Sequence, residues 1–176
     1  MEGHEKYIRE SIRLAKESGI KGHNAFGAVL VHQGEIIARG ENTEEIPQVI
    51  FGHAEFNLVR ECAGKIPVKI LEESVLYASS APCVRCLMAI ASLGIPKVVY
   101  SVSYESFKKQ LPYDMEYPDY QAHLRAMGLN LTLEGPVLEE EGLEAYTWRR
   151  GTRQSLEEIF REAEALRAES RKTVKE

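Results

Sequence analysis

Four residues of types that bind metal or carry protons lie in two short motifs about 30 residues apart. His53 and Glu55 form a His-x-Glu motif, and Cys83 and Cys86 form a Cys-x-x-Cys motif. Zinc in catalytic sites takes three nitrogen or thiolate ligands and leaves its fourth position for water. With zinc on His53, Cys83 and Cys86, these residues predict hydrolytic attack on an electrophilic carbon.

Both motifs are expected at the start of a helix. One helix is predicted for residues 53–63, and Pro82 favours the start of another over 83–93. The partial positive charge at a helix N-terminus lowers the pKa of a thiol, and the thiolate is the form that binds metal. Glu55 lies about 200° around the helix from His53, so we expect it to exchange a proton with the zinc-activated water rather than to ligate the metal.

Each motif also has a simpler interpretation. A Cys-x-x-Cys pair also occurs in redox and structural sites. A glutamate such as Glu55 in the first turn of a helix interacts favourably with the helix dipole without any catalytic role. A zinc-stabilised scaffold is therefore an alternative to an enzyme, but a scaffold has no need of a carboxylate beside the metal. The four residues together favour an enzyme. Cys62, which has no partner at a useful spacing, is expected to be a small core residue.

Strands that alternate with helices predict an α/β sandwich in one domain. The hydrophobic pattern predicts five strands, at residues 26–32, 35–38, 74–78, 97–101 and 129–133. It predicts helices at residues 5–18, 53–63, 83–93, 119–127, 137–148 and from 156 onward, with an irregular segment at 104–118.

Composition narrows the class of protein. The 176 residues are 44% hydrophobic and 28% charged, which is enough for a core without disulfides. The 22 Lys and Arg against 27 Asp and Glu give a net charge of -5, which argues against a nucleic-acid-binding protein. A charged N-terminus, no long apolar run and three cysteines predict a cytoplasmic protein without a membrane segment.

The motifs and their surroundings resemble the cytidine deaminase-like superfamily of zinc-dependent base deaminases. This resemblance implies a three-layer α/β/α fold with a central mixed five-stranded sheet. It also implies one Zn²⁺ per chain on His53, Cys83 and Cys86, with Glu55 as the proton shuttle that helps convert a ring C–NH2 group to C=O and ammonia. The similar segments within residues 5–101 are Asn24-Ala-Phe-Gly-Ala-Val-Leu-Val, Gly40-Glu-Asn42, His53-Ala-Glu55, Ala81-Pro-Cys83-Val-Arg-Cys86 and Ile95-Pro-Lys-Val-Val-Tyr.

Within the superfamily, the sequence is most similar to the guanine, cytosine and tRNA-adenosine deaminase branch. Its Asn24 to Val29 run resembles an Asn-Pro-Phe-Gly-Ala-Val stretch of bacterial guanine deaminases, with Ala25 in place of proline. Asn42 matches an asparagine that hydrogen-bonds the base in this branch, although asparagine there also suits a turn. Asp114 lies where guanine deaminases carry an acidic residue. The resemblance implies substrate contacts from Asn42, Phe26, Ala54, Asn24 and Asp114.

The resemblance implies a deaminase of a free nucleobase or related nitrogen heterocycle, with guanine favoured. It places the deaminase domain at residues 1–150 and a C-terminal helical extension at 151–176, and it implies a homodimer. A tRNA-specific adenosine deaminase is an alternative, but that group usually carries a Lys-Thr-Gly-Ala-like segment where this chain has residues 101–105. Cytosine or nucleoside deamination also stays open. Arg85 faces either a substrate anion or solvent.

Overall fold

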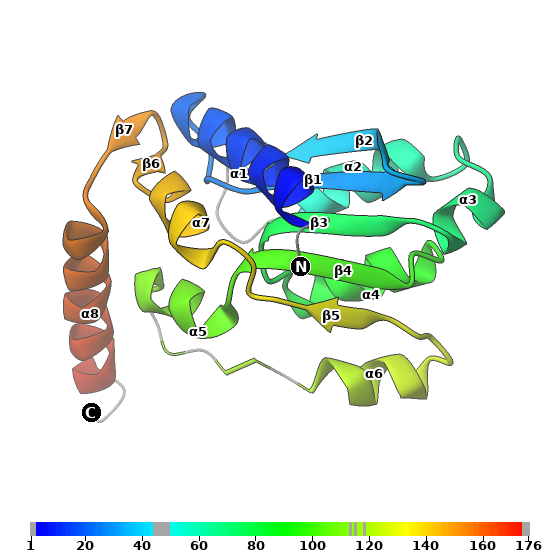
Figure 1. Cartoon of the computed structure of the whole chain (residues 1–176). Helices are drawn as coiled ribbons and strands as arrows, with labels where there is room; N and C mark the ends of the chain where they lie inside the picture. Colours follow the sequence, from blue (N-terminus) through cyan, green and yellow to red (C-terminus); the bar gives the residue numbers. More distant parts are fainter. Residues whose placement is uncertain (1–2, 44–49, 113, 115, 118, 174–176) are drawn as a thin grey trace.

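The computed structural model contains the predicted mixed five-stranded sheet between two layers of helices (Figure 1). It describes residues 3–43, 50–112, 114, 116–117 and 119–173. The five strands are β1 (Gly27–His32), β2 (Glu35–Glu41), β3 (Val75–Ser80), β4 (Lys97–Val102) and β5 (Thr132–Glu134). Their order across the sheet is β2-β1-β3-β4-β5. β1 is antiparallel to β2 and β3, whereas β3, β4 and β5 are parallel.

The central strands supply side chains to two hydrophobic cores, one on each face of the sheet. Successive side chains of a strand point to opposite faces. Leu30 of β1 and Leu76 of β3 are therefore buried in one core, and Val29 and Tyr77 in the other. A sheet that is apolar on both faces needs helices on both, as the predicted three-layer fold requires.

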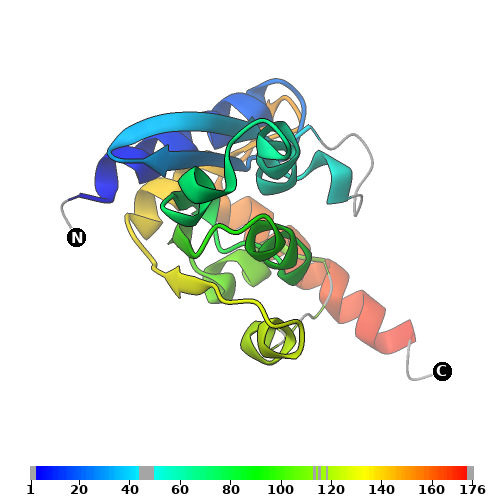
Figure 2. The ribbon, with the colours of Figure 1, turned by 90° about the vertical axis from the view of Figure 1, so that its right-hand side faces the viewer.

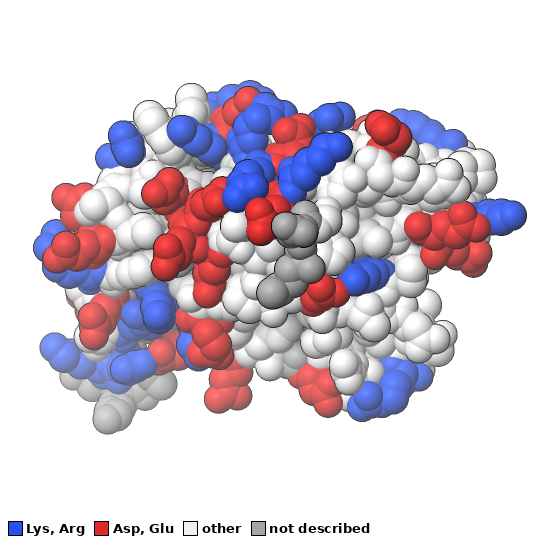
Figure 3. All heavy atoms as spheres, in the orientation of Figure 1, with Lys and Arg blue, Asp and Glu red and all other residues white. Residues whose placement is uncertain are grey.

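Helices cover each face of the sheet (Figures 1 and 2). One face carries α1 (Glu5–Ile20) and α7 (Glu139–Ala145), and Ile8 and Leu14 of α1 pack against Val29. The other face carries α2 (Ala54–Cys62), α4 (Val84–Ser92) and α6 (Tyr120–Ala126). Cys62 is fully buried in the core beneath these helices. On the face shown in Figure 3, acidic and basic side chains are interspersed.

β3 is longer than the sequence predicts. The predicted end at residue 78 is wrong, and the strand continues to Ser80. Backbone N–H of Gly27 donates to the Ser79 hydroxyl at 3.1 Å, and the Ala81 N–H donates to the Val102 carbonyl at 2.8 Å. These bonds extend the strand pairing toward the following loop. The strand therefore ends only three residues before Cys83, the first residue of the Cys-x-x-Cys motif.

The segment predicted to be irregular contains two short helical turns. These are α5 (Tyr104–Phe107) and η2 (Lys108–Gln110). The Ser103 hydroxyl accepts a hydrogen bond from the Ser106 N–H at 3.2 Å, which satisfies a free donor at the start of α5. Two further short helices, η1 (Ile50–Gly52) and α3 (Val68–Glu72), form where the sequence analysis assigns none.

A hairpin replaces the end of the helix predicted for residues 137–148. Helix α7 ends at Ala145, and β6 (Trp148–Arg149) then pairs with β7 (Thr152–Arg153). Arg150 and Gly151 form the turn with φ of 48° and 77°, a conformation that suits a two-residue hairpin turn. Gly151 is the sequence signal for this turn, and the apolar spacing around Trp148 masks it.

The predicted final helix is present as α8 (Leu156–Thr173). Ile159 and Ala163 of α8 are buried, whereas Leu166 on the expected apolar face is 52% exposed. Helix α8 stands at one end of the sheet, beside α5 and η2 (Figure 1). No helix in the described part of the chain has the length and hydrophobicity needed to span a bilayer.

Candidate metal centre and substrate pocket

The metal-ligating side chains lie at the starts of two neighbouring helices. His53 is the N-cap of α2 and Cys83 is the N-cap of α4, both with extended backbone. Cys86 lies on the first turn of α4. Pro82 precedes the N-cap and so lies just before the helix whose start it is predicted to favour. Because α2 and α4 pack side by side on one face of the sheet, their N-termini meet at one edge.

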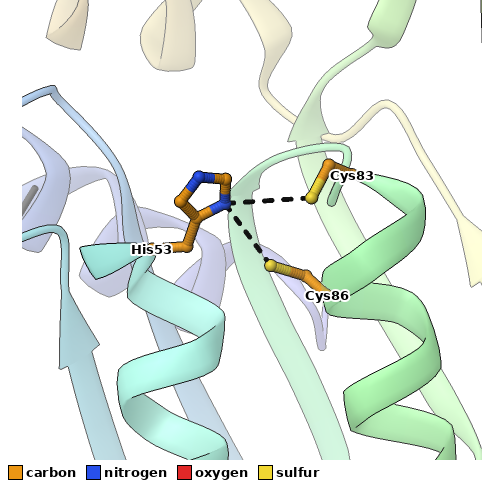
Figure 4. Close-up of side chains that lie close together, drawn as sticks. All are labelled: His53, Cys83 and Cys86. Carbon is orange, nitrogen blue, oxygen red and sulfur yellow. Dashed lines mark hydrogen bonds between the residues drawn. The ribbon is translucent and has the colours of Figure 1, made fainter. Parts of the chain in front are cut away.

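The three donors converge on one point (Figure 4). Nδ1 of His53 lies 3.8 Å from Sγ of Cys83 and 3.5 Å from Sγ of Cys86, and all three donor atoms lie within 4.8 Å of one another. Tetrahedral zinc with ligands at roughly 2.0–2.3 Å places neighbouring ligand atoms about 3.4–3.8 Å apart. The nitrogen and two sulfurs therefore fit zinc with a fourth position left for a non-protein ligand.

The protonation of the two thiols also fits a cation. A hydrogen bond from Cys86, with a further one from His53, lowers the pKa of Cys83 to about 3 despite partial burial. The same hydrogen bond and deep burial raise the pKa of Cys86 well above its ordinary value. One thiolate is thus stable alone, but a second adjacent negative charge is not. A divalent cation supplies the charge that allows both sulfurs to ligate.

Glu55 lies in the first turn of α2, beside the metal ligands. Its side chain is buried, and the residue is only 7% exposed. Burial, followed by the negative charge of Cys83, raises the pKa of Glu55 to about 7. A carboxyl group with this pKa can take up and release a proton near neutral pH, as general acid–base catalysis requires. Its position is thus suited to the proton transfer expected from the sequence.

A cavity of about 540 Å³ opens above this cluster. His53, Cys83 and Glu55 line it, and four of the residues expected to contact substrate line it as well: Asn24, Phe26, Asn42 and Ala54. Asp114 is not among the lining residues in the described part of the chain. Its exposed carboxylate instead accepts hydrogen bonds from Arg171 of α8, with Nε at 2.6 Å from Oδ2.

The backbone of Asn42 is held in place by two neighbours. Its N–H donates to the Phe26 carbonyl at 3.0 Å, and the buried Ser18 hydroxyl donates to its carbonyl at 2.6 Å. Asn42 itself is 1% exposed at the edge of the cavity. No sequence motif identifies Ser18, because its partner Asn42 is distant in the sequence, just after the end of β2.

Aromatic rings form a wall of the cavity, of which the sequence analysis names Phe26 alone. Phe26 makes edge-on contacts with Phe107 and Tyr146, each with ring centroids 5.7 Å apart. Tyr104 and Tyr117 pack with centroids 4.5 Å apart, and the Tyr117 hydroxyl donates to the Pro82 carbonyl next to the metal ligands. Apart from Phe26, which precedes β1, these residues come from α5, the loop after η2 and the end of α7, so only the tertiary fold brings them together.

Comparisons with known proteins identify relatives that are named as deaminases. The model of the cytidine and deoxycytidylate deaminase zinc-binding region matches residues 1–102. A tRNA-specific adenosine deaminase of Bacillus subtilis (strain 168) is 38% identical over 96 residues, which are 54% of this chain and 60% of that protein. A guanine deaminase of the same organism is 36% identical over 100 residues, or 55% of this chain and 62% of that protein. The match thus spans about three fifths of these relatives.

The fold is shared with solved structures across most of the chain. The guanine deaminase from Nitrosomonas europaea superposes with a TM-score of 0.60 at 16% identity, and the superposition covers 90% of this chain and 83% of that one. The deaminase and reductase protein from Thermotoga maritima gives the same TM-score at 24% identity, covering 82% of this chain and 39% of that one. Both confirm the expected α/β/α architecture.

Proposed function

The chain belongs to the cytidine and deoxycytidylate deaminase family, and we propose that it is a zinc-dependent hydrolytic deaminase of a small aminated nitrogen heterocycle. The observation that carries this proposal is the buried Glu55 carboxyl, which lines the same cavity as His53 and Cys83, two members of the donor cluster that Cys86 completes. A scaffold needs the three donors alone. Burying a carboxyl group costs folding free energy, and carboxyl groups with perturbed pKa values cluster at functional sites, so a buried Glu55 beside the donors favours an enzyme.

In the proposed reaction, water replaces the amino group on a ring carbon, so that C–NH2 and H2O become C=O and NH3. His53, Cys83 and Cys86 would hold the zinc, which would supply the Lewis acidity that makes water a nucleophile at neutral pH. Glu55 accepts the proton of the attacking water and then donates it to the leaving nitrogen. The amides of Asn24 and Asn42 can offer both donors and acceptors to the ring edge, and the wall around Phe26 packs against its face.

Guanine is the base that we propose as the preferred ring. The identity to a guanine deaminase and the Asn24 to Val29 run support this choice. The identity to tRNA-specific adenosine deaminases supports the second candidate, adenosine in tRNA. The net charge of -5 supports the small substrate, because polynucleotide binding draws on a basic surface. A homodimer, a cytoplasmic location and an extension beginning at residue 151 are further parts of this proposal.

The proposal is tested first on Glu55. We expect Glu55→Gln to keep zinc, because no metal ligand changes, and to lose at least about 100-fold in deamination rate. Glu61→Gln is the matched control, since Glu61 lies on the same helix but pairs with Lys65 at the surface. Zinc content is measured by metal analysis, and ammonia release is measured with guanine, cytosine, adenine and their nucleosides. Full activity of Glu55→Gln would exclude this proton-transfer role, and activity on tRNA alone would reject the small-substrate proposal.

A further inference from the structure

Two adjacent arginines of the β6–β7 hairpin reach the cavity that holds the metal donors. Arg149 ends β6 and Arg150 begins the turn, and both line the cavity together with Arg85 of α4. The carboxylates among the lining residues are Glu55, which lies at the metal donors, and Glu116. This cluster of guanidinium groups lies in a chain whose net charge is -5. The described lining of the cavity therefore carries three guanidinium groups against two carboxyl groups.

The backbone that carries the arginine pair is firmly attached to α1. The Arg150 N–H donates to the His23 carbonyl at 3.0 Å, and the Gly151 N–H donates to the Gly19 carbonyl at 2.8 Å. The contact is close, since a Cβ atom at Gly19 would lie 2.4 Å from the Trp148 carbonyl oxygen. The hairpin thus fixes where both side chains start, which reduces the entropy lost when they bind a ligand.

The charges of the pair are not neutralised within the described chain. Neither Arg149 nor Arg150 forms an ion pair or a side-chain hydrogen bond with any described residue, and Glu162 of α8 attracts Arg149 only from a distance. Burial, followed by the charge of Arg150, lowers the pKa of Arg149. Two neighbouring guanidinium groups, one of them partly buried, are unfavourable without an anion. An anion in the cavity would relieve both effects.

We propose that Arg149 and Arg150 form an anion subsite, and that the substrate is an aminated heterocycle carrying a phosphate monoester, as a nucleoside monophosphate does. This inference rests on the proposed deaminase function and names its substrate class, a base carried on a nucleoside monophosphate in place of the free base expected from the sequence. A phosphate monoester carries a charge of about -1.5 to -2 at pH 7, which matches two guanidinium groups, whereas a diester of an RNA backbone carries one charge. Planar guanidinium groups bind phosphate oxygens in pairs of hydrogen bonds.

The size of the cavity agrees with a substrate larger than one ring. Its volume of about 540 Å³ falls among pockets that enclose whole drug-sized ligands, which span roughly 300–1,000 Å³. The heterocycle would occupy the end lined by His53, Glu55 and Asn42. The phosphate would reach the arginine pair at the hairpin.

The first test compares matched substrates with the zinc-loaded full chain. Initial rates of ammonia release are measured for guanine, guanosine and GMP, and for the corresponding cytosine and adenine series. We expect kcat/KM for the monophosphate to exceed that for its nucleoside at least tenfold in whichever series reacts. Equal values for nucleoside and monophosphate would overturn the subsite and leave the deaminase function standing. Reaction with an RNA stem-loop alone would also overturn it.

The second test needs no turnover. Binding of GMP and of inorganic phosphate is measured by calorimetry for the natural chain and for Arg149→Gln/Arg150→Gln. We expect affinity for both to fall at least tenfold, whereas Arg161→Gln on the exposed side of α8 retains it. The charge-retaining Arg149→Lys/Arg150→Lys should keep an intermediate affinity and serves if the first variant unfolds. Unchanged affinity in a folded Gln variant would refute the subsite. Binding that depends on the pair, in a chain without deaminase activity, would support the subsite and reject the proposed function.

Discussion

A single methyl group added at Gly40 tests how tightly α2, the helix whose N-cap is His53, is packed against the sheet. Gly40 lies in β2 under the first turn of α2. A Cβ atom there would lie 2.2 Å from the Ala54 carbonyl oxygen and 2.9 Å from the Leu58 Cβ, whereas ordinary contacts begin at 3.4 Å. Both contacts involve the helix backbone or atoms fixed to it, so the added methyl must displace the helix by about 1 Å, the difference between 3.4 and 2.2 Å.

The expected effect of Gly40→Ala has two parts. Forcing a methyl group into a closely packed core costs about 1–3 kcal/mol, which for a domain of this size lowers Tm by roughly 2–12 °C. Ala54 lies between His53 and Glu55, so the same displacement moves a metal ligand and the proton carrier together. A misplacement of about 1 Å in an active site can cost about 100-fold in rate. We therefore expect a larger loss in kcat/KM than the loss of stability alone would give.

The assay combines thermal unfolding, zinc content and ammonia release. Gly3→Ala is the matched control, because it adds the same methyl group where no heavy atom lies within 4 Å. The comparison is made at a temperature at which both variants are more than 95% folded, so that unfolding does not contribute to the rate. If Gly40→Ala has the Tm, zinc content and kcat/KM of Gly3→Ala, the close contact between β2 and α2 does not position the site.

Three further changes probe the metal centre, the cavity wall and the surface. Cys83→Ala should abolish stoichiometric zinc binding in metal analysis, whereas Cys62→Ala, in the buried core, should retain it. Arg167→Ala should raise KM several-fold with a smaller change in kcat, because Arg167 Nη1 donates to three carbonyls of the turn at residues 108–111, which lines the cavity. Arg167→Lys should restore little of the lost affinity, and an unchanged KM in Arg167→Ala would contradict this role. Hydrogen bonds from two arginines lower the pKa of Glu10 to about 2. The charged Glu10 therefore stabilises the fold by about 1–3 kcal/mol above pH 4.5, and this contribution is lost as the pH falls toward 2. Unfolding curves of Glu10→Gln and the natural chain should therefore differ at pH 7 and converge near pH 2.

The metal donors were predictable because their geometry is local. Cys83 and Cys86 lie at the start of one helix, where sequence spacing alone indicates that both side chains point the same way, and His53 lies at the start of another. The sheet was predictable for a related reason, since β1 and β3 are continuous apolar runs that must be buried on both faces. What the sequence could not show directly was that α2 and α4 lie side by side, and there the resemblance supplied the arrangement.

The rest of the site depends on contacts between distant segments. Arg149 and Tyr146 reach the cavity only because α7 ends early and a hairpin turns the chain back toward α1. The apolar spacing of residues 137–148 favours a longer helix, and one glycine after it outweighs that pattern. Asp114 is a position where the resemblance implies a substrate contact, but its carboxylate is paired with Arg171 of α8. No local sequence pattern indicates where α8 packs, so this pairing could not be predicted.

The sheet topology also sets the order in which the metal site can assemble. The donors come from α2, which follows the β1–β2 hairpin, and from α4, which connects the parallel strands β3 and β4. They meet only after β1 has paired with β3, where Ala28 lies opposite Ala78. Such long-range pairing is slow compared with local structure. We expect zinc to be captured after the folding transition state, so that it slows unfolding while leaving the refolding rate unchanged, unlike the zinc fingers that need metal in order to fold at all.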